Sequence, residues 1–132
     1  VHAHPQWSTF LTMVGQAYLP VYAQGSLVYP VPVLDSPNSI NNKEMADRLA
    51  QTLGDRPAAL MKSHGAVTVG QSIIDAFVLA AYMEENAHRQ YMAMQIGKPY
   101  AFNETELALC REKLWNDKLF QRTWDHFHGQ LY

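Results

Sequence analysis

The sequence has only one cysteine, Cys110, among its 132 residues, so no disulfide can form within the chain. One free thiol and the lack of a basic, apolar leader fit a reducing compartment, and we expect a cytoplasmic protein. Long hydrophobic runs are also missing. The longest begins at Ala76 and ends before Glu84, although about 20 apolar residues are needed to span a bilayer. We therefore expect no membrane partner.

The sequence also has no large excess of charge of either sign. Ten Lys and Arg residues against twelve Asp and Glu residues give a formal net charge of −2, and neither sign forms a block. Since nucleic-acid binding depends on clustered cations, we expect no nucleic-acid partner. Hydrophobic residues make up 48 % of the chain, which allows one sizeable core at this length and favours a single domain over 1–132.

Short extended segments alternate with helical ones along the chain. From apolar spacing and the positions of Pro and Gly, we expect strands at 1–4, 19–22, 31–34, 58–61 and 66–69. We expect helices at 7–14, 41–53 and 72–96, and one last helix that starts at 103 and runs past Trp124. Asn41 and Glu44 form a capping-box pattern at the start of the second helix. The alternation predicts an α/β or α+β fold.

Two histidines at the start of the chain are candidates to share a metal ion. His2 and His4 lie two residues apart on an expected strand, whose alternate side chains point to one face. His64 follows in a turn between two strands, where Gly65 can adopt a conformation that other residues resist. Neutral imidazoles bind Zn²⁺, Mn²⁺ or Fe²⁺, and catalytic metal sites usually hold three protein ligands and keep one position open. Taken alone, the His-x-His pair is more typical of two surface histidines, and the His-Gly pair is more typical of a plain turn.

The other histidines have a different setting. His126 and His128 share the spacing of the first pair but lie on an expected helix, where residues two apart do not face each other. We expect them to face the surface or a partner. His88, within the long helix, is expected to form a structural hydrogen bond. Glu84, one turn earlier, either orients a ligand histidine or pairs with His88 at i, i+4.

In combination these motifs resemble the class II aldolase/adducin family. The resemblance rests on Val-His-Ala-His-Pro at 1–5, Ser-His-Gly at 63–65, Val-Thr-Val-Gly at 67–70, and a helix that carries Asp75 and Glu84. It covers residues 1–97 and implies a mostly antiparallel central sheet flanked by helices. It also implies that His2, His4 and His64 bind a divalent metal, most often zinc.

The resemblance also shows departures. The family's catalytic glutamate and its substrate- and phosphate-binding loops precede the paired histidines, so residues 1–132 are expected to lack the N-terminal part of the family fold. Some members use a tyrosine that reaches a neighbouring subunit's site. Tyr22 and Tyr29 lie in that region, and Tyr22 is the candidate for that catalytic role. The family implies a homo-oligomer, a fourfold ring (tetramer), which the aromatic stretch at 115–132 also favours.

The function implied by the resemblance is that of a metal-dependent carbon–carbon lyase acting on a small-molecule acid or sugar. A divalent ion stabilises the enolate that carbon–carbon cleavage leaves, and aldolases and decarboxylases share this apparatus. The aromatic C-terminal stretch favours decarboxylation of an oxo or hydroxyaromatic acid, because apolar walls suit planar acids. Two alternatives stay open: an aldolase or 4-epimerase acting on a sugar phosphate, and a non-catalytic adducin-like interaction module.

Overall fold

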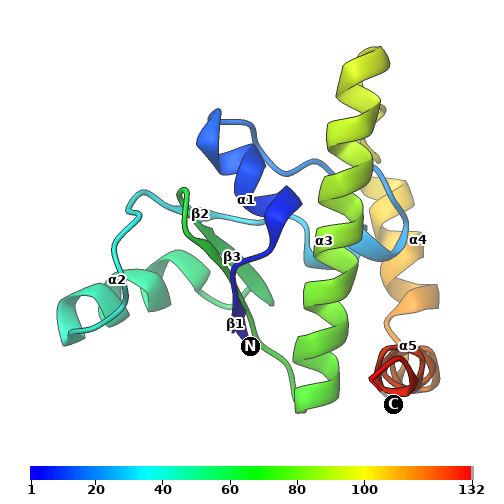
Figure 1. Ribbon diagram of the computed structural model, residues 1–132. Helices are drawn as coiled ribbons and strands as arrows, with labels where there is room; N and C mark the ends of the chain where they lie inside the picture. The colour runs from blue at the N-terminus through cyan, green and yellow to red at the C-terminus, as the bar shows by residue number, and fades with distance from the viewer. Residues whose placement is uncertain (132) are drawn as a thin grey trace.

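A computed structural model describes residues 1–131, which form one four-stranded sheet packed between helices (Figure 1). The strands are β1 (His2–Ala3), β2 (Val33–Leu34), β3 (Ala58–Met61) and β4 (Gly65–Thr68). The helices are α1 (Gln6–Met13), α2 (Lys43–Leu53), α3 (Ile73–Ile96), α4 (Glu104–Leu114) and α5 (Asp117–Gly129), with a short 3-10 helix at Gln24–Val28. Within residues 1–131, no helix is both long and apolar enough to cross a membrane.

The sheet is mostly antiparallel. Its strands lie in the order β1-β4-β3-β2, and β4 pairs in antiparallel fashion with both of its neighbours. Only β2 runs parallel to its neighbour, β3. Parallel neighbours need a crossover, and α2 supplies it between β2 and β3. The prediction of a mixed α/β fold with a mostly antiparallel sheet is therefore confirmed.

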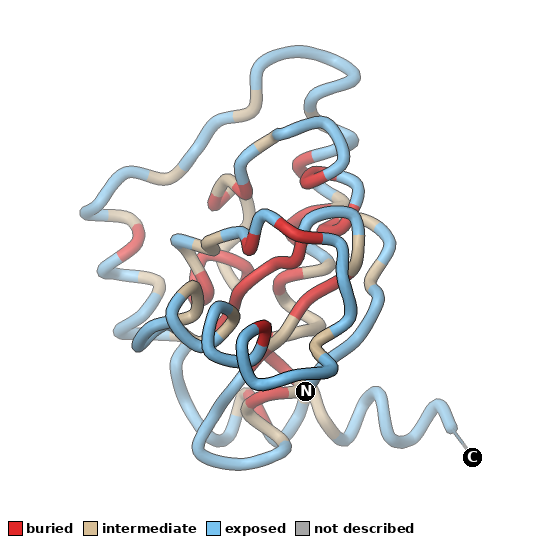
Figure 2. Tube along the Cα trace, turned by 90° about the vertical axis from the view of Figure 1, so that its left-hand side faces the viewer, coloured by how far each residue is buried: buried red, intermediate tan, exposed pale blue. Residues whose placement is uncertain are grey.

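Strand β3 separates two parts of the core. All four residues of Ala58–Met61 are buried, and neighbouring side chains of a strand point to opposite faces. Leu60 belongs to the larger cluster, which includes Phe120 and lies against α1, α3 and α5. Met61 belongs to a smaller cluster with Met45 of α2. Figure 2 shows this buried centre inside largely exposed connections.

The strand expected at 19–22 is wrong. The segment is irregular, and a side-chain amide of α3 takes the place of a neighbouring strand. Asn86 Oδ1 accepts the N–H groups of Val21 (3.1 Å) and Tyr22 (3.0 Å), and Asn86 Nδ2 donates to Leu19 O (2.7 Å). Because Asn86 is fully buried, it satisfies backbone groups that would otherwise lack a partner.

The single last helix expected from 103 onward is also wrong, because the segment forms two helices, α4 and α5. The break falls at Asn116, whose side chain accepts the N–H of Leu119 (3.1 Å) and so caps α5. A capping residue has extended backbone geometry and therefore interrupts a preceding helix. The capping box at Asn103 and Glu106 is present at the start of α4.

Of the element boundaries that differ from the sequence prediction, two have a clear physical cause. Helix α2 is capped by Asn42, which accepts the N–H of Met45 (2.9 Å), rather than by Asn41. The strand expected at 31–34 is limited to Val33–Leu34, because proline lacks the N–H that a longer ladder needs.

Glu84, in the middle of α3, caps the N-terminus of α1. Pro5 precedes α1 and provides no side-chain cap. The Glu84 carboxylate accepts the N–H groups of Trp7 (2.5 Å) and Ser8 (3.0 Å) and the Ser8 hydroxyl (2.8 Å). Neither role expected for Glu84 is found, since α1 occupies both carboxylate oxygens. The ring of His88 stacks on Trp7 instead, with the centroids 4.2 Å apart.

We expect Glu84→Ala to lower the free energy of unfolding by about 1–3 kcal/mol, because three donors at the start of α1 lose their acceptor. Urea denaturation followed by circular dichroism measures this change. Glu85→Ala is the matched control: Glu85 is exposed and pairs with Arg89 at 2.8 Å, so its removal should cost about 0–1 kcal/mol. Equal losses in the two variants would contradict the capping role.

Candidate metal centre

The pairing of β1 with β4 brings three imidazoles together. His2 lies opposite Val67 in the ladder, and His4 follows β1 by one residue. His64 precedes β4, so the same strand pair places its ring beside the other two. The ring centroids are 5.0 Å apart for His2–His4, 5.3 Å for His2–His64 and 5.0 Å for His4–His64. One nitrogen from each ring lies within 4.8 Å of the others, the only such group of three potential ligands in residues 1–131.

The environment of His2 determines which of its nitrogens is available to a metal. His2 Nδ1 lies 2.9 Å from the carbonyl oxygen of Ala66, and a carbonyl only accepts, so Nδ1 carries the proton. The neutral ring then keeps its Nε2 lone pair for a ligand. His2 and His4 are exposed, whereas His64 is half-buried. The Nδ1 atom of His64 is buried and has no hydrogen-bond partner.

Helix α1 supports the turn that carries His64. The His64 N–H donates to Met61 O (3.0 Å), which closes the turn after β3. The Ser63 N–H donates to Thr12 Oγ1 of α1 (2.9 Å). Ser63 has φ 55° and is the left-handed residue of the turn, a conformation that costs most residues about 1–2 kcal/mol. The prediction that Gly65 has this role is wrong.

Gly65 is required for a different reason, the close approach of β1. A Cβ atom on Gly65 would lie 2.3 Å from Ala3 O and 3.0 Å from His4 Cδ2. Contacts this short force the neighbouring atoms to move, and Ala3 O belongs to the backbone of β1. The absence of a side chain at this position therefore allows His4 to lie beside His64.

We expect Gly65→Ala to reduce the free energy of unfolding by about 1–3 kcal/mol through this overpacking. The displaced β1 should also separate His4 from His64. Urea denaturation and nuclear Overhauser contacts between the two imidazoles measure both effects. Gly129→Ala is the control, because nothing lies within 4 Å of the added Cβ. Unchanged stability together with intact contacts in Gly65→Ala would refute the role of Gly65.

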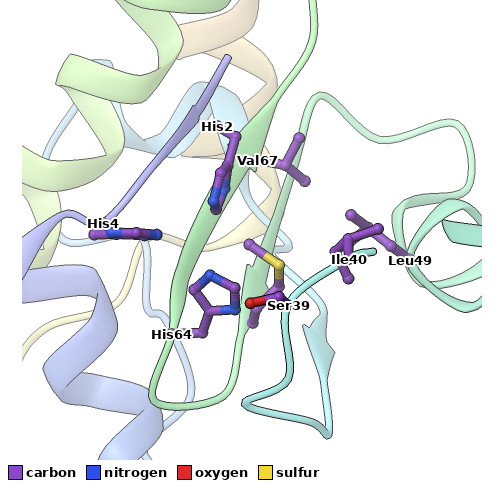
Figure 3. Close-up of a pocket in the computed structure, with 8 residues that line it drawn as sticks. His2, His4, Ser39, Ile40, Leu49, His64 and Val67 are labelled. Atoms are coloured by element: carbon purple, nitrogen blue, oxygen red, sulfur yellow. The ribbon is translucent and has the colours of Figure 1, made fainter. Parts of the chain in front are cut away.

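The triad forms one side of a pocket of about 470 Å³ (Figure 3). The remaining lining residues are Ser39, Ile40, Leu49, Met61 and Val67. Four of these five side chains are apolar, and no lysine or arginine lines the pocket within the described part of the chain. Three of these lining residues, Ser39, Ile40 and Leu49, were not predicted from the sequence to belong to the site. No local pattern indicates that these three residues lie beside the histidines.

Other candidates from the sequence lie away from this pocket. The Tyr22 ring lies under the Arg89 guanidinium, with 4.1 Å from Cζ to the ring centroid, and Tyr22 does not line the triad pocket of its own chain. His126 Nε2 forms a hydrogen bond with the side-chain amide of Gln130 (2.9 Å). In α5, Trp124 packs edge-to-face on the Phe77 ring. Hence the aromatic C-terminal stretch covers the start of α3 rather than the triad.

Comparison with protein-family models identifies the family. Residues 1–91 match the model of the Class II Aldolase and Adducin N-terminal domain, and the chain belongs to this family. The matched region includes all three histidines of the triad. Among curated protein sequences, no match to the chain is found.

Solved structures show the same fold. An aldolase II superfamily protein from Pseudomonas syringae superposes with a TM-score of 0.80 at 19 % identity, over 99 % of this chain and 55 % of that one. L-fuculose-1-phosphate aldolase from Thermus thermophilus gives 0.61 at 29 % identity, over 76 % and 56 %. YgbL from Escherichia coli, for which aldolase, epimerase and decarboxylase are alternative assignments, gives 0.62 at 27 % identity, over 84 % and 56 %. The chain thus spans about half the length of the structures that it matches.

Proposed function

We propose that the chain carries the metal centre of a divalent-metal-dependent carbon–carbon lyase, with His2, His4 and His64 as the ligands. The observation that supports this proposal is the convergence of three imidazole nitrogens within 4.8 Å at the side of a pocket. Three nitrogen donors suit zinc, and manganese or iron are alternatives. The donor set and its spacing therefore fit the metal that the family implies.

The chemistry follows from what the three side chains leave available. A bound divalent ion would act as a Lewis acid toward the enolate or enediolate that carbon–carbon cleavage produces. Three neutral imidazoles add no negative charge of their own, so the charge on the ion stays available to an anion. Ile40, Leu49 and Val67 give the triad apolar neighbours on the pocket side, whereas His2 and His4 are exposed in this chain.

We favour decarboxylation of an oxo or hydroxyaromatic acid as the reaction. The support is the apolar pocket lining from Ile40, Leu49, Met61 and Val67, since apolar walls suit planar acids. The aromatic stretch of α5 gives no support within one chain, because it packs on Phe77. Aldol cleavage or 4-epimerisation of a sugar phosphate is the second candidate, favoured by the 29 % identity to L-fuculose-1-phosphate aldolase.

Two further elements of the proposal concern groups outside the triad. The acid/base glutamate and the substrate loops are proposed to belong to a part of the fold that precedes residue 1. Tyr22 is proposed to act at the site of a neighbouring copy in a homotetramer. Exposed apolar side chains on α1 and α3, including Phe10, Met13 and Tyr91, offer the kind of surface that such an assembly covers.

We expect the purified chain to retain about one divalent ion, zinc in the first place, because three imidazoles with an open position form a sufficient ligand set. His64→Ala should lose this ion. Inductively coupled plasma mass spectrometry after dialysis measures the metal content. His126→Ala is the matched control, a histidine outside the triad, and should retain the ion. A metal-free unchanged chain would favour the adducin-like interaction module, and equal metal contents in the two variants would contradict the ligand assignment.

At the full natural length of the protein, with metal supplied, we expect release of CO₂ from aromatic or β-keto acids to exceed release of aldehyde from sugar phosphates. His64→Ala should lower kcat/KM by at least about 10²-fold, the effect of losing one group that stabilises the oxyanion. A coupled assay over both substrate classes measures these rates. Turnover of sugar phosphates alone would favour aldol cleavage over decarboxylation as the reaction. Unchanged activity in His64→Ala would contradict the assignment as a metal-dependent lyase.

A further inference from the structure

The two ring nitrogens of His64 have unequal surroundings. Figure 3 shows Nε2 facing the other two imidazoles, while Nδ1 lies on the side of Ser39. Nδ1 is buried and has no hydrogen-bond partner. In His2, by contrast, the corresponding atom donates to Ala66 O at 2.9 Å. If His64 binds a metal through Nε2, its Nδ1 carries a proton, and this N–H needs an acceptor.

A buried donor without an acceptor is unfavourable, and histidines that bind metals almost always donate their second N–H to a neighbouring group. The pocket offers few acceptors for this purpose. Of the five lining residues other than the histidines, only Ser39 has an oxygen or nitrogen in its side chain. Three of the remaining four side chains are aliphatic, and the fourth, Met61, carries a thioether sulfur, which is a weak acceptor.

The backbone around Ser39 allows its hydroxyl to approach the ring. Ser39 lies in the connection between β2 and α2 and is exposed. The connection is held at each end by its own hydrogen bonds, from Ser36 N–H to Leu34 O (2.8 Å) and from Asn41 N–H to Ser39 O (3.1 Å). Ser39 itself lies in no helix or strand, and its hydroxyl takes part in neither of these bonds.

We propose that Ser39 is a positioning residue of the metal centre: its hydroxyl accepts the Nδ1–H of His64 when Nε2 binds the ion. This inference rests on the proposed function, because it presupposes the metal. The hydrogen bond fixes the tautomer and the ring orientation of His64, which lies in the turn between β3 and β4. It also raises the basicity of Nε2.

The test compares the zinc affinity of three variants of the full chain by competition with a chromophoric chelator. We expect Ser39→Ala to raise the Kd for zinc about tenfold, as other losses of a hydrogen-bond partner to a metal-binding histidine do. Ser39→Thr keeps the hydroxyl and should restore the affinity of the unchanged chain. Asn38→Ala, in the neighbouring exposed position, should have no effect. Thermal unfolding of the metal-free variants shows whether folding is equal.

A second readout follows the proton itself. Long-range ¹H–¹⁵N spectra of the zinc-bound chain should show His64 protonated at Nδ1 and metal-bound at Nε2, with slow exchange of the Nδ1 proton. This exchange should accelerate in Ser39→Ala and not in Ser39→Thr. Equal zinc affinity in Ser39→Ala and the unchanged chain, or metal bound to Nδ1 of His64, would contradict the proposed role of Ser39. Neither result would contradict the proposed metal centre. No zinc binding by the unchanged chain would overturn both.

Discussion

The site depends on the close approach of β1 to β4. Ala3 O lies where a side chain on residue 65 would be, and only glycine leaves that space open. The approach sets the ladder register of His2 opposite Val67 and so determines the position of two of the three imidazoles. Ligands from separate parts of a chain must be held within a few tenths of an ångström for metal binding, and a backbone contact achieves this more rigidly than long side chains do.

Helix α1 connects the segment that carries His2 and His4 with the turn that carries His64. It starts two residues after His4, and Glu84 of α3 fixes its first turn through three hydrogen bonds. Near its other end, Thr12 accepts the N–H of Ser63 beside His64. One short helix thus determines the position of the paired histidines and of the distant turn. Because α3 fixes the position of α1, α3 also supports the site, although none of the three histidines lies on α3.

Local patterns predicted that the three histidines converge, but did not predict their surroundings. The spacing of His2 and His4 and the Ser-His-Gly turn predicted the convergence, because strand periodicity and a tight turn are properties of neighbouring residues. The cap from Glu84 and the buried amide of Asn86 join segments more than 60 residues apart, and no local pattern indicates such pairs. The break at Asn116 had a local signal, an N-cap residue within the helical stretch, which the apolar stripe obscured. The sequence pointed to Gly65 for its backbone freedom, whereas the structure requires glycine there because of the contact with Ala3.

The central claim is that His2, His4 and His64 form one coordination sphere. X-ray absorption at the metal edge of the zinc-loaded chain tests it most directly, because it measures the ligands around the ion itself. The account predicts three imidazole nitrogens at about 2.0–2.1 Å, with one further light atom that completes a tetrahedron. A shell of oxygen atoms with one imidazole or none would contradict it.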